Sequence, residues 1–428
     1  MTSHAAETTT LSPPHEETTK IFDAWLEAKG PVALRLRQRL LPVEADDSGR
    51  GVIFPPTYAD IGYNVDTLAD GTRVAMIDTV GSQANRVEPI FKSTGKNDKG
   101  EELNPLASLV PQIEIVLHKK VATKKGKETE PDSGESDNHI EKRSILDLAH
   151  RSADAVVLAT PTLAGEVAKA FEALRNKGNA VPLCTIAPTS LVFGVWDSRG
   201  GSGEKRPRLV RSIIRAWDVE ILHSAAQFNS VWKALSEAQK KELEKEAKTK
   251  KVKLSVKGFA DAPATFRTDK VAQFVAGAPN PEARVLGGVF AKGPIERDVT
   301  INLVALRGLR GKDPEETKQV QKYVLGLALL AATADLELFL REGCLLRYAG
   351  DDVWCAVPRR GDPDPAGVRL PELEQLEAYA SAAAAPFKDK WPKDKDGKPL
   401  ALEHEFNLAE AKKLLAKKDD DAQADAQE

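Results

Sequence analysis

The chain has few cysteines and no pattern that would pair them or hold a metal. Three cysteines occur among 428 residues, far apart and without a CxxC pair: Cys184, Cys344 and Cys355. This scarcity argues against a disulfide framework and a structural zinc site, and it favours a reducing compartment, so a cytoplasmic protein is expected. The seven histidines do not stand at metal-ligand spacing either. We therefore predict no metal and no other cofactor.

Long apolar runs and common enzymatic fingerprints are also missing. No stretch approaches the roughly 20 apolar residues that a membrane span needs, and the N-terminus lacks the apolar core of a signal peptide. Every Gly-Lys pair is followed by Glu, Asp, Asn or Pro, so the phosphate-binding GxxxxGK[ST] motif does not occur. GxGxxG, HExxH and GxSxG are absent as well. The sequence thus offers no motif for catalysis.

Charge is nearly balanced over the whole chain but concentrated in one segment. The net charge is -3, so the protein is not basic as a whole. Between Arg199 and Arg215, six cations stand against one acid, Glu204. The six cations are Arg199, Lys205, Arg206, Arg208, Arg211 and Arg215. Any contact with nucleic acid must come from such local patches, and its strength must fall as salt rises.

This basic segment is framed by residues typical of strands. β-Branched and aromatic residues predict a strand over 191–196, and glycines in 198–203 leave the backbone free to approach a ligand. Residues 209–217 fit a strand or an amphipathic helix, and we favour the strand. Either structure puts Arg211 and Arg215 on one face. Like charges without an acid between them repel unless an anion lies over them, which favours phosphate binding over a solvated basic loop.

Two segments nearer the N-terminus supply further polar candidates. The alternation over 33–43 predicts a strand with leucines on one face and arginines on the other: Arg35, Arg37 and Arg39. An ordinary solvent-facing strand would have the same pattern. After a hairpin expected at Asp70-Gly71, Ser82 is a candidate helix N-cap. Three polar residues would then lie beside free backbone N–H groups, where anions bind: Gln83, Asn85 and Arg86. A plain capped helix is the alternative.

The remaining composition predicts one elaborated domain with mobile ends. We expect disorder over 1–19, a single domain over 20–415 and a disordered acidic tail over 416–428. Within the domain, residues 119–143 predict a flexible charged insert, and residues near 230–256 predict an exposed helical insert.

Two apolar stretches predict core elements in the second half of the chain. Residues 299–306 indicate a strand that is buried on both faces, with Arg297 and Arg307 beside it. Residues 315–340 indicate one long core helix.

Three segments together carry a specific resemblance. They are VDTLADGTRVAMIDTVGSQANRVEPIF (65–91), APTSLVFGVWDSRGG…PRLVRSIIRAWDV (187–219) and LGGVFAKGPIERDVTINLVALR (286–307). In this order they resemble the RAMP-superfamily backbone subunit of type I-G (formerly type I-U) CRISPR effector complexes, over most of residues 32–345. GSQANR and VFGVWDSRG are the most specific strings. The resemblance implies an α+β fold: an RRM-like, ferredoxin-like palm of antiparallel sheet and helices, with thumb-like inserted loops and a helical part.

The resemblance also implies a function and partners. Several copies would assemble as a helical filament along guide RNA, together with other subunits of the effector complex. They would hold the RNA phosphates and leave the bases free to pair with a target DNA strand, while a separate nuclease-helicase cuts DNA. No catalytic residue is expected. The expected RNA contacts are Ser82, Gln83, Asn85, Arg86, Arg199, Lys205, Arg206, Arg208, Arg211 and Arg215, and more weakly Arg35, Arg37, Arg39, Arg297 and Arg307.

Two alternatives stay open at this point. The first is a metal-dependent ribonuclease on the same fold, with Asp66 or Asp78 as the metal ligand. Related subunits of type III complexes cleave RNA with a loop aspartate, but no loop aspartate of this chain aligns with theirs. The second is a stand-alone RNA-binding regulator.

Overall fold

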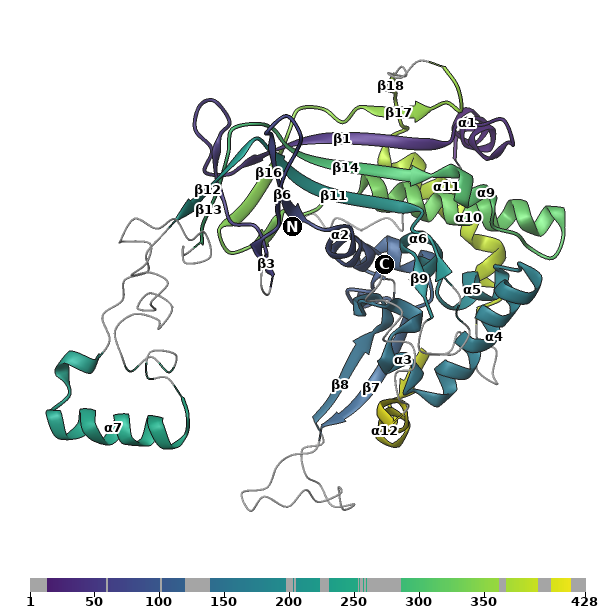
Figure 1. Ribbon diagram of the computed structural model, residues 1–428. Coiled ribbons are helices and arrows are strands. Elements are labelled where there is room, and N and C mark those ends of the chain that lie inside the picture. The colour runs from purple at the N-terminus through teal and green to yellow at the C-terminus, as the bar shows by residue number, and fades with distance from the viewer. Residues whose placement is uncertain are drawn as a thin grey trace, which may run out of the picture.

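The centre of the molecule is a large antiparallel sheet. The computed structural model describes residues 14–58, 61–100, 102–119, 139–197, 203, 205–223, 231–252, 254, 257, 259, 286–361, 367–391 and 402–416. Four strands lie side by side in its middle (Figure 1): β1 (Ala33–Pro42), β14 (Ile295–Asn302), β11 (Val210–Trp217) and β6 (Arg73–Asp78). Beyond them the sheet includes β5 (Val65–Thr67), β15 (Phe339–Arg341), β16 (Cys344–Ala349), β17 (Trp354–Val357) and β18 (Gly367–Val368).

Side-chain alternation along the strands divides the sheet into an apolar and a charged face. Leu36 on β1 pairs with Val299 on β14, and Val299 pairs in turn with Ser212 on β11. All three side chains are buried. The residues between them face the other way, and there Arg37 and Arg39 are exposed. The predicted alternation over 33–43 is therefore confirmed, as is the choice of strand over helix for β11.

Helices cover one face of this sheet. Beneath the strands in Figure 1 lie α2 (Val80–Val87), α10 (Pro314–Thr333) and α11 (Leu373–Lys388). Helix α10 is buried almost all round, which is typical of a core helix. An added Cβ at Gly326 would lie 2.8 Å from the Cα of Ala380 on α11, so glycine permits this close approach. An antiparallel sheet with helices on one face is the expected α+β, RRM-like palm.

A second group of elements lies below the sheet in Figure 1. Its strands are β7 (Ile113–Lys119), β8 (His139–Ser144) and β19 (Leu402–Glu405). Its helices are α3 (Ala155–Leu158), α4 (Pro161–Lys177), α5 (Val181–Ile186), α6 (Thr189–Phe193) and α12 (Leu408–Ala416), with short 3-10 turns at Glu88–Phe91, Pro105–Leu109, Ile145–Asp147 and Arg151–Ala153. One apolar core continues from the palm into this group.

The remaining elements lie around the sheet or, for α7, away from it. They are β2 (Gly51–Ile53), β12 (Val219–His223) and β13 (Leu286–Ala291) in one small sheet, the pair β3 (Thr57–Tyr58) and β4 (Gly62–Tyr63), α1 (Glu16–Leu26), a 3-10 turn at Val231–Ala234, α7 (Glu237–Thr249) and α9 (Leu303–Arg307). Figure 1 shows α7 away from the sheet. No helix among the described residues is long and apolar enough to cross a membrane.

The strand predicted over 191–196 is largely wrong. Residues Thr189–Phe193 form helix α6, and all five are buried. The preference of β-branched and aromatic residues for strands depends on context, and here packing against the core outweighs it. Gly194 ends the helix with a φ of 79°, and only Val195–Trp196 form a strand, β9.

Three other predicted boundaries need correction. The strand expected over 299–306 ends at Asn302, because its side chain accepts a hydrogen bond from the backbone N–H of Ala305 (2.9 Å) and so caps α9. The long core helix ends at Thr333, and the chain then enters β15. Residues 139–143 of the expected flexible insert form strand β8, paired with β7.

Several boundaries at the ends of the chain stay predictions or lie outside the described residues. The N-terminal helix begins at Glu16, before the predicted limit of disorder at residue 19. Residues 1–13, 120–138 and 417–428 are outside the described ranges. The single-domain boundaries at 20 and 415 stay a prediction.

Candidate nucleic-acid interface

A hollow lies where residues 194–196 and 205–208 meet the start of the 3-10 turn at Arg151–Ala153. Strand β9 pairs with β10 (Lys205–Arg206), with Trp196 opposite Lys205. The hollow has a volume of about 660 Å³ and is bounded on the other side by His150 and Arg151. Four of its lining residues are cations: Arg151, Lys205, Arg206 and Arg208. The fold therefore brings basic residues that are distant in sequence together around this hollow.

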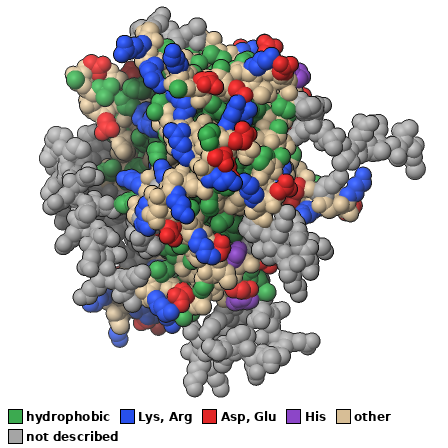
Figure 2. All heavy atoms as spheres, turned by 90° about the vertical axis from the view of Figure 1, so that its right-hand side faces the viewer, with side chains coloured by type: hydrophobic (Ala, Val, Ile, Leu, Met, Phe, Trp, Pro, Cys, Tyr) green, Lys and Arg blue, Asp and Glu red, His purple; other side chains and the backbone are tan. Residues whose placement is uncertain are grey.

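The described residues that line this hollow include no Asp or Glu. This differs from the face in Figure 2, where Lys and Arg side chains are interspersed with Asp and Glu. A concave surface lined by one sign of charge concentrates the opposite charge in front of it. The hollow is therefore suited to an anion such as a phosphate group.

Arg151 forms the floor of the hollow. Its side chain is almost fully buried, and its Nε lies 2.6 Å from Oε2 of Glu88, which is itself 1% exposed. The guanidinium also lies over the ring of Phe193, with 5.3 Å to the ring centroid. Its backbone φ is 53°, a conformation that costs a non-glycine residue free energy, so the surrounding contacts must hold it.

The ion pair beneath the hollow is strongly desolvated. Burial raises the pKa of Glu88 to about 7, although the Arg151 guanidinium and the Thr189 hydroxyl act to lower it. Burial likewise lowers the pKa of Arg151, with Glu88 opposing that shift and Arg208 adding to it. The charge at the floor of the hollow is therefore sensitive to protonation of one carboxyl group.

Trp196 supplies an exposed aromatic ring beside these cations. Its side chain is 45% exposed, and the Lys205 Nζ lies 4.9 Å from the ring centroid. Ladder pairing of β9 with β10 fixes the backbone of both residues. Arg151, His150 and Trp196 were not among the residues predicted from sequence. Arg151 is 43 positions from Gly194, whose carbonyl oxygen it contacts, and no local pattern connects the two.

The charged face of the sheet carries a second group of predicted residues. Register pairs Arg37 with Asp298 and Arg215 with Glu296. The Arg37 Nε lies 3.0 Å from Asp298 Oδ1, while Arg215 Nη1 is 3.9 Å from Asp298 Oδ2. Part of the charge on this face is thus compensated within the sheet, by acids of β14 that are distant in sequence from Arg211 and Arg215.

Three arginines of the charged face have no acidic partner within the described part of the chain. Arg39 and Arg211 are exposed and Arg35 is half-buried, and none has a hydrogen bond or ion pair within the described residues. Arg208 lines the hollow, and Arg211 follows three residues later, so their Cα atoms lie within about 10 Å of each other. Arg211 on β11 is therefore close along the chain to the residues that line the hollow.

Gln83 and Arg297 are buried beneath the sheet and do not reach the surface. Both are 0% exposed. The Arg297 guanidinium donates to Gln38 Oε1 (2.6 Å), Gln83 Oε1 (3.1 Å) and Ser212 Oγ (3.0 Å). These bonds hold the sheet to α2, so we remove both residues from the candidate RNA contacts.

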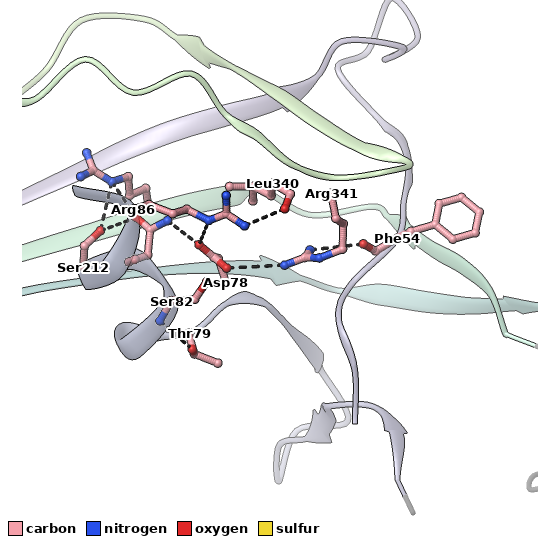
Figure 3. A network of polar contacts seen from close by, with 10 residues as sticks. Phe54, Asp78, Thr79, Ser82, Arg86, Ser212, Leu340 and Arg341 are labelled. Atoms are coloured by element: carbon pink, nitrogen blue, oxygen red, sulfur yellow. Dashed lines mark hydrogen bonds and ion pairs between the residues drawn. The ribbon is translucent and has the colours of Figure 1, made fainter. Parts of the chain in front are cut away.

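Ser82 and Arg86 also serve the fold. The N-cap of α2 is Thr79, whose Oγ1 accepts from the Ser82 backbone N–H (3.2 Å), so Ser82 is not the cap. Arg86 donates from Nε to Asp78 Oδ2 (3.1 Å) and from Nη2 to the Leu340 carbonyl (2.6 Å), as Figure 3 shows. Its guanidinium is occupied, and the predicted first-turn anion site is not formed.

Three other predicted residues have different surroundings. Asn85 is exposed, and its Oδ1 lies 3.4 Å from Arg151 Nη2. Arg307 donates from Nη1 to the carbonyl oxygens of Trp25 (2.8 Å) and Pro31 (2.9 Å), so it anchors α1. Arg199 lies outside the described residues.

The aspartates considered as metal ligands are poorly suited to that role. Asp78 is buried, and its two oxygens face Gln83 (2.6 Å), Arg86 (3.1 Å) and Arg341 (3.5 Å). Asp66 is exposed on β5. Across the described part of the chain, no three His, Cys, Asp or Glu side chains are grouped so that they could hold a metal ion.

A comparison with protein families adds an independent finding. Residues 34–221 match the family described as CRISPR-associated protein GSU0053 (Cas_GSU0053). The matched range contains β1, the hollow and β11, whereas β14 and α10 lie outside it. No curated protein matches the chain. The matched range contains two of the three segments that carry the RAMP-like resemblance, 65–91 and 187–219, and this part of the chain is similar to CRISPR-associated proteins of the GSU0053 type.

Proposed function

We propose that this protein is a non-catalytic backbone subunit of a type I-G CRISPR effector complex in the cytoplasm. Several copies assemble along guide RNA together with the other subunits. Each copy binds RNA phosphates and leaves bases free to pair with a target DNA strand. The family match supports a role in a CRISPR system, and the basic surface supports RNA as the ligand.

The observation that carries this proposal is the hollow lined by Arg151, Lys205, Arg206 and Arg208 without a carboxylate among its described lining residues. Phosphate contacts position a nucleic acid without reading its sequence, which is what a subunit that accepts any guide requires. Arg211, which is exposed on β11 three residues after Arg208, would bind a further phosphate. We keep Arg35, Arg39, Asn85 and Arg211 as further candidates outside the hollow.

Ribonuclease activity has less support in this chain. A metal-dependent mechanism needs carboxylates that are free to bind the metal. Asp78 instead forms ion pairs with Arg86 and Arg341. The proposal therefore assigns cleavage to other subunits. Incubation of the RNA-bound protein with complementary RNA and Mg²⁺ should leave that RNA intact.

The test of the proposal is co-expression with guide RNAs of several lengths. We expect multimers whose size increases with the length of the co-purified RNA. Affinity for unrelated spacers should be similar and should fall steeply with salt. A protein that stays monomeric with every guide length would overturn the filament, and a strong preference among spacers would overturn phosphate binding as the main interaction.

A further inference from the structure

We infer that the hollow also binds a nucleobase, which stacks on the ring of Trp196. This inference rests on the proposed RNA binding and deepens it, because it gives one residue a contact that the phosphates cannot make. Trp196 is 45% exposed although it lies at the edge of a concave site, where most tryptophans are more deeply buried. An open aromatic face at a hollow lined by cations is the arrangement on which a nucleobase can stack.

The surroundings of the ring specify the chemistry of that ligand. The Lys205 ammonium lies 4.9 Å from the ring centroid, and Arg206 and Arg208 line the same hollow. An aromatic ring beside several cations suits a ligand with a flat apolar face and a negative charge. A nucleotide has both, because its base stacks on aromatic rings and its phosphate meets the cations.

The geometry allows both contacts to form at once. β-Ladder pairing places Trp196 and Lys205 opposite each other, so a base on the ring brings its phosphate within reach of the lysine. Lys205 is exposed and flexible, and it can leave the ring for the phosphate when a base takes its place. The hollow, about 660 Å³, is larger than a single nucleotide needs. Stacking tolerates every base, so the contact does not make the protein sequence-specific.

The test compares RNA with an abasic strand of the same length. Wild-type protein should bind a uridine oligomer at least about fivefold more tightly than the abasic ribose-phosphate oligomer, because stacking contributes roughly 1–3 kcal/mol per base. The Trp196→Leu variant should bind both strands with the affinity that wild type has for the abasic strand. Trp196→Phe keeps an aromatic face and should keep most of the preference. Melting temperatures of the three proteins verify that each is folded.

A second measurement reads the ring directly. Trp196 fluorescence should be quenched by the uridine oligomer, and the difference between wild type and Trp196→Phe isolates that signal from the other tryptophans. If wild type and Trp196→Leu discriminate equally against the abasic strand, or if this quench is missing, the stacking inference is wrong while phosphate binding stands. If neither strand binds wild type in a salt-dependent manner, the proposed function itself fails.

Discussion

Two groups of arginines in this protein illustrate opposite uses of the same side chain. Beneath the sheet, Arg297 and Arg86 donate to acceptors from five different elements of the fold. At the hollow, Lys205 and Arg208 are exposed and converge on an open space. The first group holds the palm together, and the second leaves its charge for a ligand. A basic residue in a sequence therefore indicates binding only when its internal partners are known.

The two groups should respond to substitution in opposite ways. Changes beneath the sheet should reduce stability and spare the RNA affinity of the folded fraction. Changes at the hollow should reduce RNA affinity and spare stability. Each prediction below tests or sharpens this contrast, beginning with the largest expected effect.

Asp78→Asn should destabilise the protein most. The substitution removes the charge that Arg86 and Arg341 face, and breaking a buried pair by removing one partner costs about 3–5 kcal/mol. Figure 3 shows these contacts converging on Asp78. Denaturant unfolding should report the loss, and RNA titration of the folded fraction should give wild-type affinity. A variant with unchanged stability and weakened RNA binding would show that Asp78 contributes to RNA binding and not to the stability of the fold.

Gly194→Ala should reduce both stability and RNA affinity, because Gly194 lines the hollow and packs closely against its wall. An added Cβ would lie 3.0 Å from the backbone N of Arg208 and 3.1 Å from the carbonyl O of Arg206, and the backbone φ is 79°. We expect a loss of about 1–3 kcal/mol of stability together with weaker RNA binding.

Gly165→Ala is the matched control for that substitution. Gly165 lies within α4, and an added Cβ there meets no atom within 4 Å. The change should stabilise the protein by up to about 1 kcal/mol and leave RNA binding unchanged. If both alanine variants behave alike in unfolding and in RNA titration, the hollow does not depend on Gly194.

Glu88 should make RNA binding depend on pH. Its pKa in the folded protein is about 7, raised by burial from 4.5. Below pH 7 the carboxyl group is neutral, so the Arg151 charge is uncompensated and RNA should bind more tightly. An effect of about fivefold between pH 8 and pH 6 corresponds to one unit charge roughly 4 Å away in a water-like dielectric.

Glu88→Gln should remove this part of the pH dependence and hold the affinity at its low-pH level. The raised pKa has a second consequence, because stability from Glu88 is fully present below pH 4.5 and is lost as the pH rises through about 7. The free energies of unfolding of the protein with Glu88 and of its Glu88→Gln variant should therefore diverge above neutral pH. Both measurements use a His150→Asn background, which removes the histidine that lines the hollow. If RNA affinity depends on pH in the same way in both proteins, Glu88 does not control the charge of the hollow.

Arg211 and Arg215 provide the smallest contrast, within a single strand. Arg215 lies 3.9 Å from Asp298, whereas Arg211 has no partner among the described residues. Arg211→Ala should weaken RNA binding and change stability by less than about 0.5 kcal/mol. Arg215→Ala should lose up to about 1 kcal/mol, the range of exposed ion pairs, with a smaller effect on RNA. The double variant measured by melting and RNA titration should show the sum, since additivity holds for independent sites.

Local patterns were enough to predict much of the palm. The leucine–arginine alternation of β1 and the Asp70-Gly71 turn depend on neighbouring residues only, and both are confirmed. The helix at Thr189–Phe193 was missed because burial, not local preference, determines its conformation. The positive charge of the basic segment can be read from the sequence. Which of its cations face the hollow and which have partners within the fold cannot.

The candidate site was only partly predictable for a related reason. Arg151 reaches the hollow from a distant segment, and nothing in its sequence neighbours indicates this. Gln83 and Arg297 were expected to bind RNA because polar residues in these segments suggested a surface, whereas the register places them between the sheet and α2. Burial and hydrogen-bond partners depend on tertiary structure, so they separate structural from functional cations only once the fold is known.

The central claim is that the hollow binds RNA phosphates through its cations. The most direct measurement is the salt dependence of guide RNA affinity for Lys205→Ala/Arg208→Ala beside a control with the same charge change, Lys241→Ala/Lys245→Ala on α7, where both lysines are exposed. The hollow variant should lose affinity for every spacer, and its slope of log affinity against log salt should shrink by up to about 0.7 per lost contact on a single strand. The control should keep the wild-type slope, and all three proteins should melt alike. Equal slopes for the hollow variant and wild type would contradict the account.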